Sequence, residues 1–318
     1  MSDVLIQARG LKKYFQTPSG SLHAVDDVNF DIKRGHTLGV VGESGCGKST
    51  LGRLLLRLIE PTAGEIFYKG ENILKYNNRT LAQKRQEFQM IFQDPYSSLD
   101  PRMSVGEIIA EPMIIYKMCK SKAQIDNKVS EMMDTVGLAD RFVNAYPHEL
   151  DGGRRQRIGI ARALSVNPNF IVCDEPVSAL DVSIQAQILN LLMDLQSQKE
   201  LTYLFITHNL SVVKHISDEI MVMYLGQCVE QASSKELFKN PCHPYTKALL
   251  SSIPIANLSA KKMKREIIKG ELSSPINPLP GCRFYPRCKY ACEKCIGREL
   301  PFTEVDKDHF VMCHLFEK

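Results

Sequence analysis

The chain has 318 residues, of which 44% are hydrophobic, and its 40 basic and 36 acidic residues leave a formal net charge of +4 at pH 7. A chain of this length and composition is expected to fold as a globular protein of two or three lobes. The nearly balanced charge argues against an extended nucleic-acid surface, so no nucleic-acid partner is expected. The longest uncharged stretches, such as residues 248–260, are shorter than the ~18 apolar residues of a membrane-spanning helix, and the N-terminus lacks the apolar core of a signal peptide. We therefore expect a chain that neither crosses a membrane nor is exported.

The first informative pattern is a strand, a glycine-rich loop and a helix. Residues 37–41, Thr-Leu-Gly-Val-Val, form a short apolar stretch that predicts a buried strand. The apolar stripe of the helix after the loop consists of Leu51, Leu54, Leu55 and Leu58. Between them, residues 42–50 read Gly-Glu-Ser-Gly-Cys-Gly-Lys-Ser-Thr, in which three glycines let backbone N–H groups turn inward around an anion. Lys48 supplies a positive charge and the Ser49 hydroxyl a ligand for Mg²⁺, so the loop predicts a nucleoside triphosphate as ligand.

Two later segments give weaker signals. Gln93, in the segment Ile-Phe-Gln-Asp-Pro at residues 91–95, carries little information by itself. A Gly-Gly turn at Gly152 and Gly153 precedes a helical stretch whose free N–H groups can face a phosphate. The apolar positions of that helix are Ile158, Ile160, Ala161 and Leu164. The position of this turn just ahead of the next predicted strand strengthens the evidence for a functional role.

Polar residues follow two further apolar strands. Residues 170–173, Phe-Ile-Val-Cys, lead into Asp174, where the aspartate that organises Mg²⁺ is expected in this kind of fold. Glu175, one residue beyond the strand end, can polarise the water that attacks the γ-phosphate. Residues 203–207 predict another strand, and His208 follows it at the sheet edge where ligands bind. A histidine in this position is more often an ordinary polar cap, and only its neighbours favour a functional role.

These motifs together resemble those of the nucleotide-binding subunit of an ATP-binding cassette (ABC) transporter, over essentially the whole chain. The resemblance implies a Walker A loop with contacts to ATP from Gly42, Glu43, Ser44, Gly45, Cys46, Gly47, Lys48, Ser49 and Thr50. It also implies that Ser49, Gln93 and the Walker B aspartate, Asp174, organise Mg²⁺. Phe15 best fits the aromatic position that stacks on adenine, with Tyr14 as the alternative. Either aromatic is otherwise a core residue of the first strand.

The resemblance also implies the catalytic residues. Gln93 matches the Q-loop, Glu175 the catalytic glutamate and His208 the switch histidine. The sequence Ser-Ala-Leu-Asp at residues 178–181, which ends at Asp181, matches the D-loop. In this family two subunits face head to tail, and each ATP lies between the Walker A loop of one subunit and the signature turn of the other. Hydrolysis therefore implies a dimer.

The signature turn departs from the family pattern. The usual sequence is Leu-Ser-Gly-Gly-Gln, whereas here Asp151 replaces the serine and Arg154 the glutamine. A carboxylate near the γ-phosphate is expected to repel it by ~1 kcal/mol or more unless Arg154 or Arg155 compensates. Together with Gly152 and Gly153, Asp151 would complete the ATP site of the partner subunit. The departure predicts a heterodimer with two unequal ATP sites.

A C-terminal extension follows the nucleotide-binding domain. We place that domain at residues 1–228, with a helical subdomain at about 96–165, and the extension at residues 229–318. The extension contains His-Pro-Tyr-Thr and, at residues 280–288, Pro-Gly-Cys-Arg-Phe-Tyr-Pro-Arg-Cys. These stretches resemble the C-terminal region of oligopeptide and dipeptide permease ATPases, a group that also includes nickel importers. Lysines and prolines around residues 254–280 predict a linker followed by a small lobe.

The small lobe is too short to be held together by apolar burial alone, so it needs a cross-link. Five of the ten cysteines lie in it, and because disulfides are rare in a reducing cytosol, they predict a metal site. A [4Fe–4S] cluster or a four-cysteine zinc site needs four thiolates, and the candidates are Cys282, Cys288, Cys295 and Cys313. Their wide spacing resembles the iron–sulfur tails of peptide permease ATPases. Zinc and free structural thiols are the alternatives, Cys292 is a substitute ligand, and a structural role is expected.

The expected fold is α/β. It is a P-loop NTPase with a RecA-like core, an antiparallel β-subdomain around residues 3–35 and 62–73, the helical subdomain and the small Cys-rich C-terminal lobe. The implied activity is ATP hydrolysis that powers the import of dipeptides or oligopeptides from the cytoplasmic face of the membrane. The implied partners are a second, non-identical ABC ATPase, two membrane permease subunits and, indirectly, an extracytoplasmic solute-binding protein. A nickel importer, or a soluble ABC ATPase that acts on DNA or ribosomes, is the alternative.

Overall fold

The structure is a computed structural model that describes residues 3–252, 270 and 274–317. The predicted linker around residues 254–280, with its cluster of lysines, lies largely outside the described residues. By its internal contacts the chain forms two compact units. The first comprises residues 1–3, 33–36 and 73–206, and the second comprises residues 4–32, 37–72 and 207–318.

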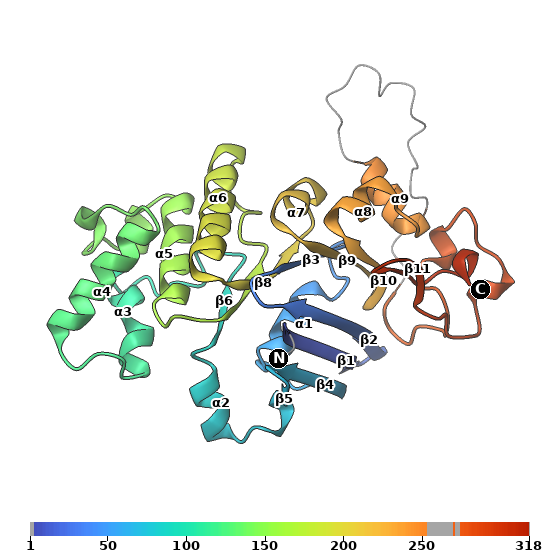
Figure 1. Ribbon diagram of the computed structural model, residues 1–318, viewed down its shortest axis with the longest axis horizontal. Coiled ribbons are helices and arrows are strands. Elements are labelled where there is room, and N and C mark those ends of the chain that lie inside the picture. The colour runs from blue at the N-terminus through green and yellow to red at the C-terminus, as the bar shows by residue number, and fades with distance from the viewer. Residues whose placement is uncertain (1–2, 253–269, 271–273, 318) are drawn as a thin grey trace, which may run out of the picture. The chain divides into compact units, whose positions relative to one another are not determined.

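The first unit contains a parallel sheet and a group of helices (Figure 1). Its strands are β6 (Phe88–Ile91), β7 (Phe170–Asp174) and β8 (Thr202–Thr207), and β7 pairs in parallel with both others. Every residue of β7 and β8 is buried, as expected of parallel strands with both faces covered. The helices are α2 (Asn78–Lys84), α3 (Val105–Ile115), α4 (Lys122–Thr135), α5 (Gly152–Leu164) and α6 (Val182–Lys199), with 3₁₀ turns at Ile73–Lys75, Asp140–Phe142 and Pro147–Glu149.

Side-chain caps determine where the helices of this unit begin. Before α3, the side chains of Ser104 and Glu107 each accept a hydrogen bond from the other residue's backbone N–H group. Ser121 caps α4, and Asp181 caps α6. α3, α4 and α5 pack on one another and appear in green in Figure 1. The caps and this mutual packing together specify a compact helical part of the unit.

The second unit contains two sheets, of which one is antiparallel. Its strand order is β2-β1-β4-β5, from β1 (Val4–Thr17), β2 (Gly20–Lys33), β4 (Ala63–Tyr68) and β5 (Glu71–Asn72). β4 pairs antiparallel with β1 and with β5. These strands confirm the antiparallel sheet that the sequence predicts.

The other sheet of the second unit carries the glycine-rich loop. β3 (Thr37–Val41) pairs in parallel with β9 (Glu219–Tyr224), and β9 pairs antiparallel with β10 (Gln227–Ser233). β10 pairs with β12 (His309–Val311), and β12 with β11 (Thr303–Asp306). The C-terminal extension thus adds its last two strands to the sheet of β3. The helices are α1 (Lys48–Leu55), α7 (Leu210–Ile216), α8 (Ser234–Lys239) and α9 (Pro244–Ser251), with 3₁₀ turns at Tyr285–Arg287, Glu293–Cys295 and His314–Phe316.

The helix after the glycine-rich loop is shorter than predicted. α1 ends at Leu55, and Leu56 is its C-cap. The next residue, Arg57, has a φ of +48°, which is incompatible with a continuing α-helix. Leu58 therefore lies outside the helix and is 48% exposed, so the prediction that it completes the apolar stripe is wrong.

One hydrophobic core connects the strand before the loop with the extension. Val41, the last residue of β3, is buried in the same cluster as Tyr245 of α9 and Phe284 of the cysteine-bearing segment. Residues that are distant in sequence thereby form a single packed body within the second unit.

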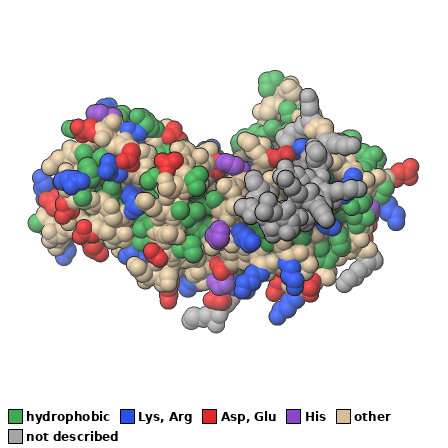
Figure 2. Space-filling model, turned by 90° about the horizontal axis from the view of Figure 1, so that it is seen from above, with side chains coloured by type: hydrophobic (Ala, Val, Ile, Leu, Met, Phe, Trp, Pro, Cys, Tyr) green, Lys and Arg blue, Asp and Glu red, His purple; other side chains and the backbone are tan. Residues whose placement is uncertain are grey.

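The surface carries both signs of charge. Basic and acidic side chains are interspersed over the face shown in Figure 2, in keeping with the small net charge of +4. In the part of the chain that the structure describes, no helix has the length and apolar character needed to span a bilayer.

Candidate functional site

The glycine-rich loop connects β3 to α1 and folds around the ammonium group of Lys48. Lys48 begins α1 and is only 5% exposed. Its Nζ donates hydrogen bonds to the carbonyl oxygens of Gly42 at 2.8 Å and Glu43 at 3.0 Å. Backbone N–H groups at this helix N-terminus favour an anion, and the buried lysine adds a full positive charge. The other predicted contact residues lie in the loop and the first turn of α1; they are Ser44, Gly45, Cys46, Gly47, Ser49 and Thr50.

Close backbone approaches require glycine at two points of the loop. Gly47 has a φ of +102°, and a Cβ atom there would lie 1.9 Å from the carbonyl oxygen of Ala24. A Cβ atom at Gly42 would lie 2.2 Å from the carbonyl oxygen of Met223. No side chain fits at either distance, so the neighbouring backbone fixes the path of the loop.

The C-terminal extension contacts the loop at Glu43. The Glu43 backbone N–H donates to the hydroxyl of Tyr245 at 2.9 Å, and the Glu43 carboxylate pairs with Arg287 at 2.8 Å. The sequence did not predict either contact. Tyr245 lies in the His-Pro-Tyr-Thr stretch, so the family resemblance marked the residue without indicating its place beside the loop.

The predicted catalytic carboxylates lie at the carboxyl end of β7 in the first unit. Asp174 ends the strand and is 4% exposed, and Glu175 follows with a φ of +46°. The Glu175 backbone N–H donates to the carbonyl of Ile206 at 2.9 Å, which ties the turn to β8. Gln93, 82 residues earlier in the chain, donates from Nε2 to the Glu175 carboxylate at 3.0 Å. The fold thus brings together Gln93 and Glu175, two residues that the sequence singled out separately.

The remaining predicted residues around these strands occupy exposed ends. His208 directly follows β8 and is exposed. Asp181 caps α6 by accepting from the backbone N–H of Ile184 at 3.2 Å, and this bond and one from Ser183 lower the pKa of the Asp181 carboxyl. Asp181 is therefore a helix cap as well as a D-loop candidate.

The signature turn is held by its own aspartate. Asp151 caps α5 by accepting from the backbone N–H of Arg154 at 2.8 Å, and its other oxygen pairs with the Arg154 guanidinium at 2.9 Å. One of the N–H groups predicted to be free for a phosphate is therefore already occupied. Arg155 is buried and stacks 3.6 Å from the ring centre of Tyr96, so Arg154 is the residue that compensates the Asp151 charge. A Cβ at Gly153 would lie 2.7 Å from the Ile184 side chain, so a larger residue there would have to displace Ile184.

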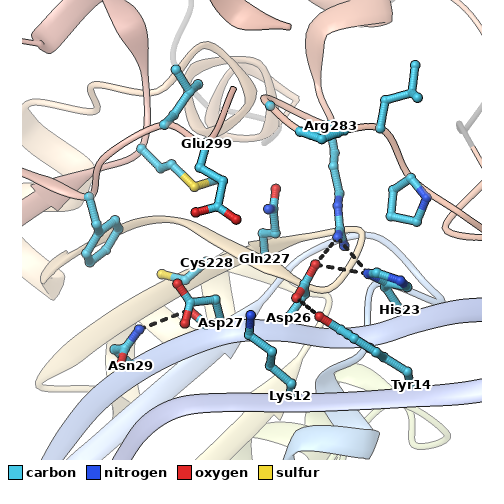
Figure 3. A pocket seen from close by; sticks show the side chains of 17 residues that line it. Lys12, Tyr14, His23, Asp26, Asp27, Asn29, Gln227, Cys228, Arg283 and Glu299 are labelled. Carbon is cyan, nitrogen blue, oxygen red and sulfur yellow. Dashed lines mark hydrogen bonds and ion pairs between the residues drawn. The ribbon is translucent and has the colours of Figure 1, made fainter. Parts of the chain in front are cut away.

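The two candidate adenine-stacking aromatics of β1 have different surroundings. Phe15 is 37% exposed, with Lys13 Nζ 4.9 Å from its ring centre. Tyr14 stacks on His23 at 3.8 Å and donates its hydroxyl proton to the carboxylate of Asp26 (Figure 3). Tyr14 thus lines a cavity of about 260 Å³ beside the cysteine-bearing segment, whereas Phe15 keeps an accessible face.

The five cysteines of the small C-terminal lobe form no disulfide in the part of the chain that the structure describes, and they differ in exposure. Cys295 and Cys313 are buried, Cys282 and Cys288 are half-buried, and Cys292 is exposed. Burial raises the pKa of Cys282 to about 12, and the neighbouring thiols at 313, 295 and 288 add to the increase. His314, which the sequence did not single out, lies with Nδ1 3.1 Å from Cys295 Sγ and Nε2 3.4 Å from Cys292 Sγ.

Known proteins with related sequences are transporter ATPases. A profile of the family described as "ABC transporter" matches residues 25–178, and one described as "Oligopeptide/dipeptide transporter, C-terminal region" matches residues 229–295. The dipeptide transport ATP-binding protein DppF of Haemophilus influenzae is 54% identical over 299 residues, which cover 92% of this chain and 90% of the relative. The oligopeptide transport ATP-binding protein AppF of Bacillus subtilis is 49% identical over 323 residues, covering 99% and 98%.

Solved structures confirm the predicted fold class. The dimeric structure of a post-hydrolysis state of the ATP-binding cassette MJ0796, bound to ADP and Pi, matches with a TM-score of 0.67 and 27% identity over 72% of this chain and 99% of that chain. CbiO1 of Clostridium perfringens, part of the ABC transporter complex cbiONQ, matches with a TM-score of 0.67 and 26% identity over 75% and 92%. The chain has a glycine-rich loop whose path only glycine permits, and it matches these relatives over nearly its whole length. It therefore belongs to the ABC transporter ATPases that carry the C-terminal region of oligopeptide and dipeptide transporters.

Proposed function

We propose that this chain is the ATPase subunit that powers the import of dipeptides or oligopeptides through a membrane ABC transporter. The observation that carries the proposal is the combination of Lys48, buried in a phosphate loop that only glycine permits, with a peptide-transporter C-terminal region in the same compact unit. The curated relatives with about half of their residues identical are named as dipeptide and oligopeptide transport proteins. The pairing of loop and extension favours peptide transport over the other uses of the cassette.

The nucleotide contacts follow from the geometry of the loop. ATP would replace the carbonyl oxygens that Lys48 now contacts, with the ammonium group and the loop N–H groups on the β- and γ-phosphates. Ser49, Gln93 and Asp174 offer the oxygen ligands that Mg²⁺ prefers. Phe15 is the better candidate for stacking on adenine because Tyr14 is engaged with Asp26.

The hydrolytic step would depend on residues of both chains of a dimer. Glu175 would polarise the attacking water, with Gln93 beside it at 3.0 Å and His208 as a further polar group near the γ-phosphate. The signature turn, Asp151 to Gly153, and the D-loop residue Asp181 would face the ATP held by the partner's Walker A loop. Closure around ATP and opening after hydrolysis then supply the mechanical cycle.

The proposed partners follow from the peptide-import role. The chain would pair with a second, non-identical ABC ATPase and act on two membrane permease subunits, with an extracytoplasmic solute-binding protein as the indirect source of the peptide. It would be a peripheral protein at the cytoplasmic face of the membrane.

Two substitutions test the assigned roles in the assembled transporter. Lys48→Ala is expected to weaken ATP binding itself, because the phosphates lose their buried cation. Glu175→Gln is expected to keep ATP bound in a closed dimer while hydrolysis at the site that contains Lys48 falls by at least about 100-fold. ATP binding and phosphate release are measured for both, and the reverse pattern would contradict the assignment. Uptake of labelled dipeptides by cells lacking the chain tests the solute, and a selective loss of nickel uptake would favour the nickel alternative.

We further propose a [4Fe–4S] cluster in the extension, held by Cys282, Cys288, Cys295 and Cys313. The thiols fit such a group because two of them are buried and two are half-buried, and because they interact electrostatically with one another, a situation that bound metal relieves by stabilising the thiolates. A single zinc ion is the alternative. Zn–S bonds of ~2.3 Å require closely spaced donors, and the ligand atoms of Cys292, Cys295 and His314 all lie within 4.8 Å of one another.

The two donor sets share Cys295 and can be separated by substitution. A cluster predicts brown, anaerobically purified protein with iron that is lost in Cys282→Ser and retained in Cys292→Ser. Zinc on the other set predicts colourless protein whose metal is lost in Cys292→Ser and retained in Cys282→Ser. Metal analysis and the visible absorbance of the two variants distinguish these outcomes, and protein free of both metals would contradict both.

A further inference from the structure

The cysteine-bearing lobe reaches the phosphate loop through Arg287. This residue ends a 3₁₀ turn and directly precedes Cys288. Its guanidinium donates to both carboxylate oxygens of Glu43, from Nη1 at 2.8 Å and from Nη2 at 3.2 Å. The two side chains are 9% and 25% exposed. A bidentate pair with this little exposure is well oriented and weakly screened by solvent, unlike an ordinary surface ion pair.

Glu43 is fixed at three of its groups. The carboxylate binds Arg287, the backbone N–H donates to Tyr245 at 2.9 Å, and the carbonyl accepts from Lys48 Nζ at 3.0 Å. Two of these three contacts come from the extension. The carbonyl contact links the fixed residue directly to the lysine that is expected to bind phosphate. The conformation of the loop therefore depends on the extension as well as on its own glycines.

A second arginine of the lobe supports the other side of the loop. Arg283, which follows Cys282, bonds the Asp26 carboxylate and the carbonyl oxygen of Leu225. Figure 3 shows its side chain running down to Asp26 and His23. The residue after Leu225, Gly226, donates its N–H to the carbonyl of Cys46 in the loop at 2.9 Å.

Buried aromatic side chains fix the position of the segment that carries Arg283 and Arg287. Phe284 is buried and packs edge-on against Tyr224 with 5.3 Å between ring centres. Tyr224 also accepts a hydrogen bond from Arg287 Nη1 at 3.3 Å. The guanidinium of Arg287 is thus positioned by packing and by a hydrogen bond before it meets Glu43.

We propose that Arg287 is a positioning residue for the phosphate loop, so that the cysteine-bearing lobe sets the affinity for ATP. The ion pair with Glu43 holds the loop in its binding conformation before the nucleotide arrives. Without this ion pair, part of the free energy of ATP binding would be used to order the loop, and the affinity for ATP would be lower. This inference goes beyond the peptide-import proposal but rests on the assignment of residues 42–50 as the phosphate loop.

The test measures the dissociation constant of a non-hydrolysable ATP analogue with Mg²⁺ for the full chain and its variants. Arg287→Met keeps the stem and removes the charge, and it is expected to raise the dissociation constant by about five- to tenfold. Arg287→Lys, which offers a single contact point, is expected to give a smaller increase. Glu43→Gln is expected to match Arg287→Met, and the double variant is expected to be no weaker than either single variant, because both remove the same interaction.

A matched control comes from the same lobe. Arg298 pairs with Glu317, and Arg298→Met removes an arginine–carboxylate pair that does not include a loop residue. It is expected to leave the dissociation constant unchanged. In the assembled transporter, Arg287→Met is expected to raise KM for ATP while kcat stays within about twofold of the wild-type value, because saturating ATP reorders the loop.

The outcomes separate this inference from the assignments on which it rests. If the wild-type chain fails to bind the analogue, or Lys48→Ala binds it normally, the phosphate-loop assignment fails. If the wild-type chain binds it and Arg287→Met lowers the melting temperature without changing the dissociation constant, Arg287 is only a structural contact and the inference is overturned. Should Arg287→Met not fold, the test relies on Glu43→Gln, which leaves the cysteine-bearing lobe intact. Unchanged binding of the analogue by Glu43→Gln would equally overturn the inference.

Discussion

The Asp151–Arg154 pair shows how a single side chain offsets an unfavourable charge at the signature turn. The carboxylate caps α5 and is paired with Arg154 at 2.9 Å. We expect Arg154→Ala to lower hydrolysis at the partner's ATP site by about fivefold, because an uncompensated carboxylate near the γ-phosphate costs ~1 kcal/mol. Phosphate release is measured in a transporter in which Lys48 of this chain is replaced by alanine. The remaining hydrolysis then comes from the partner's ATP site. Asp151→Ser together with Arg154→Ala should restore the rate, and a double variant as slow as Arg154→Ala would refute the charge argument.

The two adjacent aromatics of β1 permit a second test at the level of single residues. Phe15→Ala is expected to raise the dissociation constant of ATP by about five- to tenfold, because a stacked aromatic contributes ~1 kcal/mol or more. Tyr14→Phe should leave ATP binding unchanged, since it removes only the hydroxyl that bonds Asp26. Inorganic triphosphate, which has no base to stack, serves as the control ligand in the same calorimetric titrations. Weaker triphosphate binding by Phe15→Ala would instead indicate damage to the phosphate loop.

The residues of the candidate site also show how far the site could be predicted from the sequence. The loop, Asp174 and Glu175 were identifiable because strand and motif lie side by side in the chain. The contact of Glu175 with Gln93 could be seen only in the fold, which brings these two residues, 82 positions apart, to 3.0 Å. Arg287 lies in the stretch that resembles the transporter C-terminal region, but this resemblance gave no indication of a contact with the loop. Its importance lies in a tertiary contact with Glu43.

At the level of elements, one buried carboxylate connects β10, α9 and β12. Glu230 of β10 is fully buried and accepts from the backbone N–H groups of Cys242 at 2.7 Å and His243 at 2.8 Å. His309 of β12 lies with Nε2 2.8 Å from the same carboxylate. A buried carboxylate without these partners would be strongly destabilising, so the three elements assemble together. These contacts hold α9 and β12 on β10, the strand that pairs with β9 in the sheet of β3.

The cap of α9 predicts a loss of stability in acid. His243 accepts from the backbone N–H of Tyr245 through Nδ1, and burial lowers the pKa of His243 from 6.5 to about 4. The unfolded chain binds this proton more readily between pH 6.5 and 4, so the stabilisation is complete above pH 6.5 and decreases as the pH falls. We expect His243 alone to remove up to about 2 kcal/mol of unfolding free energy between pH 8 and pH 5. Urea denaturation at several pH values measures the slope.

His243→Asn provides the control for this pH dependence. Asparagine can cap the helix with its side-chain oxygen but does not titrate in this range. The variant should therefore show a shallower decrease of stability between pH 8 and pH 5 than the wild-type chain. An unchanged slope would mean that His243 is not the group responsible.

The elements themselves were predicted unevenly. Continuous apolar stretches identified β3, β7 and β8 because strands buried on both faces need no polar positions. The end of α1 was placed too late, since the left-handed conformation of Arg57 has no clear sequence signal. The pairing of β12 with β10 was not visible either, because a three-residue strand has little pattern and its partner lies some 80 residues earlier.

For the whole molecule, the unusual signature turn predicts two ATP sites of different strength. Each site of a head-to-tail dimer combines the Walker A loop of one subunit with the signature turn of the other. The loop of this chain would meet the partner's signature, whereas Asp151 and Arg154 would complete the site built on the partner's loop. Asp151 lacks the hydroxyl that can donate to the γ-phosphate, and its charge is only partly offset by a half-exposed arginine. The site that contains Lys48 is therefore expected to be the stronger one.

Disabling each Walker A lysine in turn tests this asymmetry. Lys48→Ala in this chain should remove most of the ATP hydrolysis and peptide uptake of the transporter, because the stronger site is lost. The equivalent substitution in the partner should leave a larger share of both activities, at least about threefold more, as expected for a difference near 1 kcal/mol in transition-state stabilisation. Hydrolysis and uptake are compared in reconstituted vesicles at saturating ATP. Equal losses would show that the Asp151–Arg154 turn works as well as the usual signature, and Asp151→Ser in the same vesicles should then have no effect on either rate.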